Sequence, residues 1–183
     1  MMHKALADLL ESLARCQPEA LPAQPVTAVL LALGSNHDAD IHLPHVRENL
    51  AALGEIQLST AFRNPDFTST EAQPKPDYTN QCVHILLTSP MTLQQLQQIF
   101  KQFECDCNRQ RLTETQAPIK KVTMDIDILL IQSAIDKNSL SKNNNIKQSK
   151  WIIMADRYPF KAHERAGIEE LMLKDFLKIK LSS

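Results

Sequence analysis

Four stretches of the chain carry the apolar patterns of β-strands. Val26–Leu33 is a continuous apolar run rich in β-forming residues, which predicts a central strand covered on both faces. Ile56–Phe62 predicts a second strand, Tyr78–Thr88 predicts a third with alternating side chains, and Val122–Ile131 is the most apolar of the four. We therefore expect one sheet with these four strands at its centre.

Helical periodicity fills two of the gaps between these strands. Residues 40–53 carry apolar positions at helical spacing, and Gly54 follows where a C-terminal cap belongs. Thr92 is placed to cap a second helix whose apolar face is formed by Leu93, Leu96, Ile99, Phe100 and Phe103. The order β-α-β-β-α-β predicts an α+β fold of the ferredoxin-like kind, an antiparallel sheet with both helices on one face.

The N-terminal residues 1–24 look like an extension of a domain formed by residues 25–183. Residues 3–16 have the spacing of a short amphipathic helix, and three prolines in residues 17–25 indicate a linker. We expect this extension to dock either on the domain or on a second subunit.

The C-terminal third contains three further features. Residues 136–150 are polar and rich in asparagine, which predicts a mobile surface insertion. Trp151–Met154 predicts an edge strand, and residues 163–179 predict a final helix.

Composition excludes several classes of function. A net charge of -1 and an aromatic content of 5% argue against a nucleic-acid partner. No apolar run is long enough for a signal peptide or a membrane span, so we expect a cytoplasmic protein without membrane contact. We also expect a monomer or a weak homodimer. The three glycines cannot build a Walker loop or a dinucleotide fingerprint, and the four cysteines lack zinc-binding spacing.

Asp125 and Asp127 carry the strongest chemical signal. Side chains alternate along a strand, so both carboxylates project to the same face, about 7 Å apart. Their mutual repulsion and their resistance to desolvation are both relieved by a divalent cation, and oxygen ligands suit Mg²⁺. The alternative is that both carboxylates project to a solvated edge.

Four basic residues surround this strand in the sequence. Arg109 and Arg111 end the second helix, where cations either complement the helix dipole or bind phosphate. Lys120 and Lys121 directly precede the strand, and a solvated lysine pair is the alternative to a phosphate contact. Basic residues beside a metal pair suit a polyphosphate.

The strand that begins at Tyr78 offers two further candidates. Asn80 has four hydrogen-bonding valences and could recognise an amide-like ring edge, or it could tie down a loop. Tyr78 is either a core residue or part of a ligand pocket.

With these residues in view, the sequence resembles the 6-hydroxymethyl-7,8-dihydropterin pyrophosphokinase family of folate biosynthesis. Its specific signal is the Asp-x-Asp strand preceded by Asn-Arg-x-Arg. The matching segments occur in the family's order and are LALGSN (31–36), STAFRNPDF (59–67), DYTNQCV (77–83), FECDCNRQR (103–111), VTMDIDILLI (122–131) and HERAGIEEL (163–171).

The resemblance implies an enzyme that transfers pyrophosphate from ATP to the pterin hydroxymethyl group and releases AMP. By position, Asp125 and Asp127 would hold two Mg²⁺ ions that bridge the ATP phosphates. Arg109 would face those phosphates, and Arg111 would lie near the phosphates or the loop region. The other residues that would approach the nucleotide are Lys101, Glu104, Lys120, Lys121 and Arg165.

The same resemblance implies a pterin pocket. Asn80 would hydrogen-bond the pterin ring and Tyr78 would line its pocket. Asn64, Pro65 and Phe67 would supply backbone and apolar contacts, and the loops 64–77 and 112–121 would close over both substrates.

The sequence departs from the family at several positions. The family's Trp-Gly-Pro-Arg stretch before the aspartate strand is replaced by APIKKVT (117–123), so Ile119 stands in place of a stacking tryptophan. Lys120 or Lys121 replaces an arginine without its bidentate geometry. Asn108 stands in place of a glycine, and Gly167 in place of a phenylalanine.

These departures leave two other functions open. The first is a catalytically impaired paralogue that binds a nucleotide or pterin or acts as a protein-interaction module. The second is a ferredoxin-like RNA-binding protein, which the neutral charge and scarce aromatics disfavour.

Overall fold

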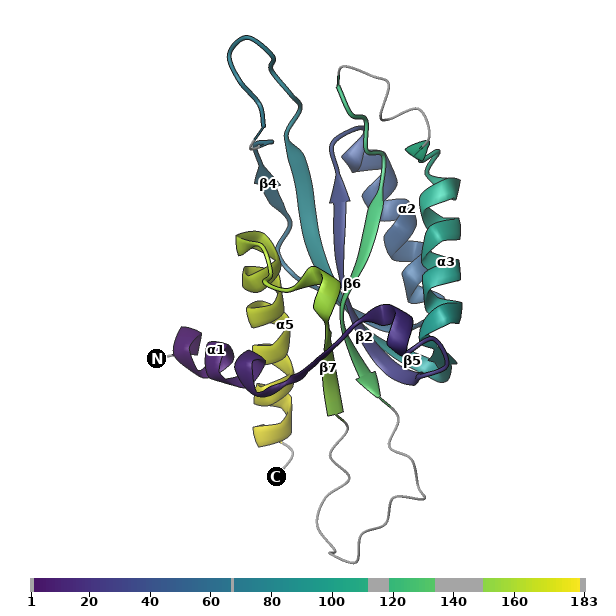
Figure 1. Ribbon diagram of the computed structural model, residues 1–183, viewed down its shortest axis with the longest axis vertical. Helices are drawn as coiled ribbons and strands as arrows, with labels where there is room; N and C mark the ends of the chain where they lie inside the picture. Colours follow the sequence, from purple (N-terminus) through teal and green to yellow (C-terminus); the bar gives the residue numbers. More distant parts are fainter. Residues whose placement is uncertain (1, 67, 112–118, 134–149, 182–183) are drawn as a thin grey trace, which may run out of the picture.

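The computed structural model describes residues 2–66, 68–111, 119–133 and 150–181. The fold is mixed α+β, with one sheet between two layers of helices (Figure 1). The helices are α1 (Met2–Ser12), α2 (Ala39–Ala51), α3 (Leu93–Asp106) and α5 (Ala162–Leu181), with single 3₁₀ turns η1 (Pro18–Ala20) and η2 (Ala155–Arg157). The strands are β1 (Ala14–Cys16), β2 (Pro25–Ser35), β3 (Gly54–Leu58), β4 (Phe62–Asn64), β5 (Tyr78–Thr92), β6 (Asp125–Ser133) and β7 (Lys150–Met154).

The sheet has the order β1-β7-β6-β2-β5-β3, and β4 also pairs with β5. Every pair is antiparallel except β1 with β7. The four predicted central strands are therefore neighbours, and β2 lies in the middle as its continuous apolar run predicts.

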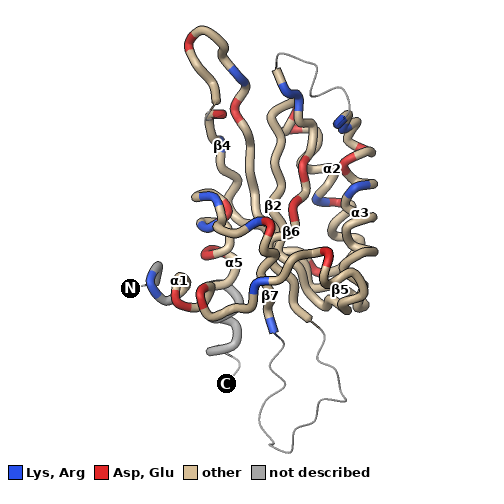
Figure 2. The backbone as a smooth tube through the Cα atoms, in the orientation of Figure 1, with Lys and Arg blue, Asp and Glu red and all other residues tan. Residues whose placement is uncertain are grey.

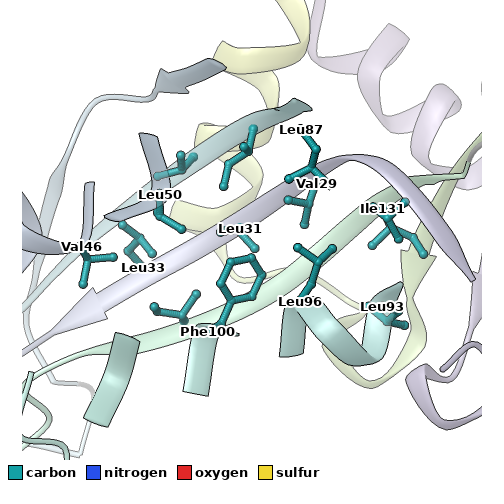
Figure 3. Packing of buried hydrophobic residues seen from close by; sticks show 14 of the residues in the cluster. Val29, Leu31, Leu33, Val46, Leu50, Leu87, Leu93, Leu96, Phe100 and Ile131 are labelled. Atoms are coloured by element: carbon teal, nitrogen blue, oxygen red, sulfur yellow. The ribbon is translucent and has the colours of Figure 1, made fainter. Parts of the chain in front are cut away.

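Helices α2 and α3 cover one face of this sheet and enclose the larger hydrophobic core. Leu31 and Leu33 of β2 pack there against Leu50 of α2 and Leu96 of α3 (Figure 3). Thr92 caps α3 as predicted: its hydroxyl accepts the backbone N–H of Gln95, whose side chain accepts the N–H of Thr92 in return.

The opposite face is covered by α5 and α1, which come from the two ends of the chain (Figure 1). Leu6 and Leu10 of α1 pack in a second core, so the N-terminal extension docks on the domain. Gly167 lets α5 approach β5, because a Cβ atom there would lie 2.5 Å from Cys82 Sγ. A large residue cannot occupy this position.

Two predictions for the edge of the sheet are wrong. The helix predicted over residues 3–16 ends at Ser12, and Ala14–Cys16 forms β1. Strand β7 is consequently not at the edge, because β1 pairs with it. A three-residue strand is too short to show alternation, and its partner lies more than 130 residues away, so local sequence could not reveal it.

Three other boundaries differ from prediction. The strand expected over Ile56–Phe62 is divided into β3 and β4, because Ser59 hydrogen-bonds both backbone groups of Cys82 at 2.9–3.0 Å. Gly54 begins β3 and is not a helix cap; its Cβ would lie 2.0 Å from Leu86 O. The predicted insertion 136–150 lies outside the described residues except for Lys150, which begins β7.

Candidate active site

The strand register places the two aspartates on one face of the sheet. Gly34 of β2 pairs with Asn80 on one side and with Asp125 on the other, and Ala32 pairs with Asp127. Paired residues direct their side chains to the same face, which is the face covered by α5. Because Ala32 and Gly34 are small, they leave an open space on this face of the sheet between Asn80 and the two aspartates. A Cβ at Gly34 would lie 3.2 Å from Asn80 Oδ1.

This open space is a cavity of about 780 Å³, called the first cavity below. Lys161, His163 and Glu164 at the start of α5 form its wall. The Nδ2 atom of Asn64 is buried and has no hydrogen-bond partner among the described residues. The predicted site residues that line the first cavity are Asn64, Pro65, Tyr78, Asn80, Arg109, Lys120, Asp125 and Asp127.

Asn36 holds the rim of the first cavity. Its Oδ1 accepts the N–H of Val122 at 2.7 Å and its Nδ2 donates to the carbonyl of Lys120 at 2.8 Å. These two bonds fix the backbone that carries Lys120 into the cavity wall. Lys121, predicted as its equal, is exposed and does not line this cavity.

Two arginines converge on Asp125, and Glu104 holds one of them. Arg109 donates to Asp125 Oδ1 at 3.3 Å and to the carbonyl of Met124 at 2.7 Å, and its side chain is only 3% exposed. Arg111 donates to the same Oδ1 at 3.2 Å and to Glu104 Oε2 at 2.7 Å. Glu104, buried, accepts the N–H of Ile126 at 2.9 Å through its other oxygen. Glu104 therefore positions Arg111 and the aspartate strand.

A second charge cluster surrounds Asp127. Arg157 of η2 forms an ion pair with Asp127 Oδ2 at 2.8 Å and donates a hydrogen bond to Glu164 Oε1 at 3.0 Å. Glu164, 2% exposed at its side chain, also accepts the backbone N–H of Lys161. Burial and the nearby charge of Asp125 raise the pKa of Asp127 to about 6, although Arg157 opposes this. The repulsion predicted for the aspartate pair is therefore present.

Asp127 also lines a second cavity, of about 270 Å³, on the other side of β6. Strand β7 pairs with residues 130–133 of β6, and the second cavity opens beside residues 126–128. Its charged lining residues are Lys101, Glu104, Arg111, Asp127, Asp156 and Arg157. Figure 2 shows acidic positions along β6 and charged positions on α3.

One predicted residue lies at a different cavity. Arg165 lines a separate shallow cavity with Phe160 and Glu169 on the outer side of α5. Phe67 lies outside the described residues, as do residues 112–118 of the second predicted loop.

Sequence reasoning missed Arg157, Glu164 and Asn36. Asn36 and Glu164 belong to the segments LALGSN and HERAGIEEL, so their place in those motifs was the available signal. Arg157 lies in no motif, and only the turn η2 brings it to Asp127.

The comparison with known families supplies the context for this centre. The sequence profile of the 7,8-dihydro-6-hydroxymethylpterin-pyrophosphokinase family matches residues 30–154, which is 125 of the 183 residues. The chain belongs to this pyrophosphokinase family. No curated protein matches the chain. Among the described residues, no helix is both long and apolar enough to cross a bilayer.

Two departures from the pyrophosphokinase pattern now have a structural reason. Asn108 adopts a left-handed backbone with φ of 58° directly after α3, a conformation that glycine and asparagine tolerate best. Gly167 gives the close contact between α5 and Cys82. Ile119, in place of the stacking tryptophan, is 43% exposed.

Proposed function

We propose that this chain transfers pyrophosphate from ATP to 6-hydroxymethyl-7,8-dihydropterin and releases AMP, as a cytoplasmic step of folate biosynthesis. The carrying observation is the position of Asp127, which lines both cavities with Asp125 beside it. A transfer between two substrates requires their reacting atoms to meet, and this carboxylate pair lies where the two cavities adjoin.

The aspartate pair fits Mg²⁺. Arg157 compensates only part of the negative charge here, because burial and the second carboxylate still raise the pKa of Asp127 to about 6, and a bound cation would supply further positive charge. Mg²⁺ is commonly bound by one or two carboxylates together with substrate phosphates and water. Asp125 and Asp127 would hold two ions, which would neutralise the phosphate charges and lower the pKa of the attacking hydroxyl.

The chemistry of the two cavities suggests which substrate each holds. Asn64 and Asn80 offer amide donors and acceptors in the first cavity, which suits a pterin ring. Lys101, Arg111 and Arg157 supply positive charge in the second cavity, which suits the nucleotide phosphates.

The reaction forms one bond and breaks one. The pterin hydroxymethyl oxygen attacks the β-phosphorus of ATP, the bond from that phosphorus to the α,β-bridging oxygen breaks, and AMP leaves as its phosphate anion. The hydroxyl proton passes to solvent. The chain aligns the two substrates and stabilises the charge on the transferred group through Arg109 and Arg111.

We also assign the central strands and helices to a ferredoxin-like core. The order β6-β2-β5-β3, with α2 and α3 on one face, supports this assignment. A monomer or weak homodimer stays our prediction for the assembly.

The test is AMP release from ATP, Mg²⁺ and 6-hydroxymethyl-7,8-dihydropterin. The variant Asp125→Asn/Asp127→Asn should lose at least about 1,000-fold in kcat because both metal ligands are neutralised. Asp8→Asn, a change of the same kind at an exposed position of α1, should keep full activity. Equal turnover by wild type and the double variant would refute the assignment.

The exposed Ile119 favours the second candidate, a paralogue that binds nucleotide or pterin without turnover. Calorimetry separates the two functions. Mg²⁺-dependent ATP binding by folded protein that releases no AMP would establish the paralogue.

A further inference from the structure

The N-terminal extension reaches the active centre, although it precedes the residues that the family profile matches. Strand β1 pairs in parallel with β7, and Arg15 is aligned with Ile153. Pro18, directly after β1, lines the second cavity. The extension therefore contacts the site through a strand pairing and a cavity wall.

A cluster of three side chains joins the extension to the turn after β7. The guanidinium carbon of Arg15 lies 3.8 Å from the centre of the Tyr158 ring. The hydroxyl of Tyr158 donates to Glu11 Oε1 at 2.5 Å, and Arg15 donates to the other oxygen of Glu11 at 2.7 Å. We call Glu11, Arg15 and Tyr158 the N-terminal latch.

The latch is one peptide bond from the charge cluster of the site. Tyr158 follows Arg157, which binds both Asp127 and Glu164. The Tyr158 ring also packs edge-on against Phe160 at 5.5 Å, which continues the contact toward α5. A shift of Tyr158 therefore also shifts the backbone of Arg157, and with it the position of the Arg157 guanidinium.

Arg157 is needed where it lies because Asp127 and Glu164 repel each other. Arg157 lies between the two carboxylates, 2.8 Å from Asp127 Oδ2 and 3.0 Å from Glu164 Oε1. A long arginine side chain has many rotamers, so its fixed position depends on a fixed backbone.

We propose that the N-terminal latch is a positioning device for the active site, which holds Arg157 on Asp127. This inference rests on the proposed function. Glu11, Arg15 and Tyr158 act through Arg157 and do not contact substrate. The N-terminal extension therefore contributes to activity by positioning Arg157.

The first test compares kcat/KM for ATP among single variants of the full chain. Tyr158→Phe removes only the hydroxyl, and Arg15→Ala removes the cation above the ring. Each should lower kcat/KM for ATP about 3–10-fold and leave KM for the pterin unchanged, and Arg15→Lys should restore part of the loss. The matched control is Asp8→Ala, an exposed acid on the same helix that lies outside the latch. Losses equal to that of the control would overturn the proposal.

A double-variant cycle separates positioning from general stability. In an Arg157→Ala background the latch variants should change kcat/KM for ATP less than about 1.5-fold, because the group they position is gone. A loss that persists undiminished in that background would show that the latch acts on stability alone, and the proposal would fall.

Hydrogen exchange distinguishes failure of this inference from failure of the proposed function. Tyr158→Phe should accelerate amide exchange in residues 155–165, whereas Asp8→Ala should not. Wild type without AMP release would refute the proposed function, and the exchange result would still decide whether the latch holds this segment. Unchanged exchange in Tyr158→Phe would overturn the latch whatever the activity.

Discussion

The two cavities beside Asp127 differ in how they are built. The first cavity lies on strand residues, where small side chains at Ala32 and Gly34 leave room between Asn80 and Asp125. The second cavity lies between a helix and a 3₁₀ turn and is bordered by three basic and three acidic side chains. The first cavity takes its amide side chains, Asn64 and Asn80, from strands, which fix their direction. The second cavity takes most of its charged groups from long side chains of a helix and a turn, which can adopt several rotamers. The first arrangement suits recognition of a rigid ring and the second suits a flexible polyphosphate.

The largest expected effect comes from removing Glu104, which lines the second cavity and accepts a hydrogen bond from the backbone of β6. Glu104→Ala leaves the N–H of Ile126 without its acceptor and Arg111 without its buried partner. We expect the free energy of unfolding to fall by about 3 kcal/mol, measured by urea denaturation.

The matched control for Glu104 is Gln98→Ala, an exposed position of the same helix, which should change stability by less than about 0.5 kcal/mol. A loss below about 1 kcal/mol for Glu104→Ala would show that β6 does not depend on this support.

The pH dependence of stability tests the environment of Asp127, the residue that lines both cavities. The pKa of Asp127, about 6, is above its unfolded value, so the folded protein binds this proton more tightly. The free energy of unfolding should therefore fall as pH rises from 4 to 6. Above pH 6 the carboxyl group of Asp127 is ionised, and the whole of this destabilisation is present. Without divalent ions, wild type should lose about 2 kcal/mol relative to Asp127→Asn between pH 4 and 7. Urea denaturation of both proteins measures this, and parallel pH profiles would contradict it.

A smaller effect tests the first cavity alone. Asn80→Ala removes hydrogen-bonding groups that face the cavity, so KM for the pterin should rise about 10-fold and KM for ATP should stay unchanged. Steady-state kinetics with each substrate varied in turn gives both values. Thr79→Ala, on the opposite side of the same strand, is the control. An equal rise in both KM values would show that the cavities do not divide the substrates.

The smallest expected effect tests the second cavity. Lys101 is an exposed point charge, so Lys101→Ala should raise KM for ATP about 3–5-fold and leave KM for the pterin unchanged. The same kinetics measures it, with Gln94→Ala on α3 as control. A rise confined to KM for the pterin would reverse our assignment of the two cavities.

Much of the fold was readable from local patterns because its central elements are long and periodic. The apolar run of β2, the helical face of α3 and the Thr92 cap are each contained in a few consecutive residues. The pairing of β1 with β7 and the division into β3 and β4 depend on partners far along the chain. Local sequence carries no record of such partners.

The same distinction holds for the site. Asp125 and Asp127 were predictable because a strand fixes the direction of alternate side chains. Arg157 was not predictable, because only the folded position of the turn η2 brings its side chain to Asp127. Arg165 was assigned by motif position, and the structure places it at a different cavity because it lies on the outer side of α5.

The sequence by itself determined the strands β2, β5 and β6, the helices α2, α3 and α5, the aspartate pair, and the family that the chain resembles, because these properties reside in short segments of fixed geometry. The tertiary structure alone decided that Asp127 lines two cavities, that Arg157 lies between Asp127 and Glu164, and that the N-terminal extension reaches the turn beside them. These last features join residues far apart in the chain, and only packing of the whole domain brings them together.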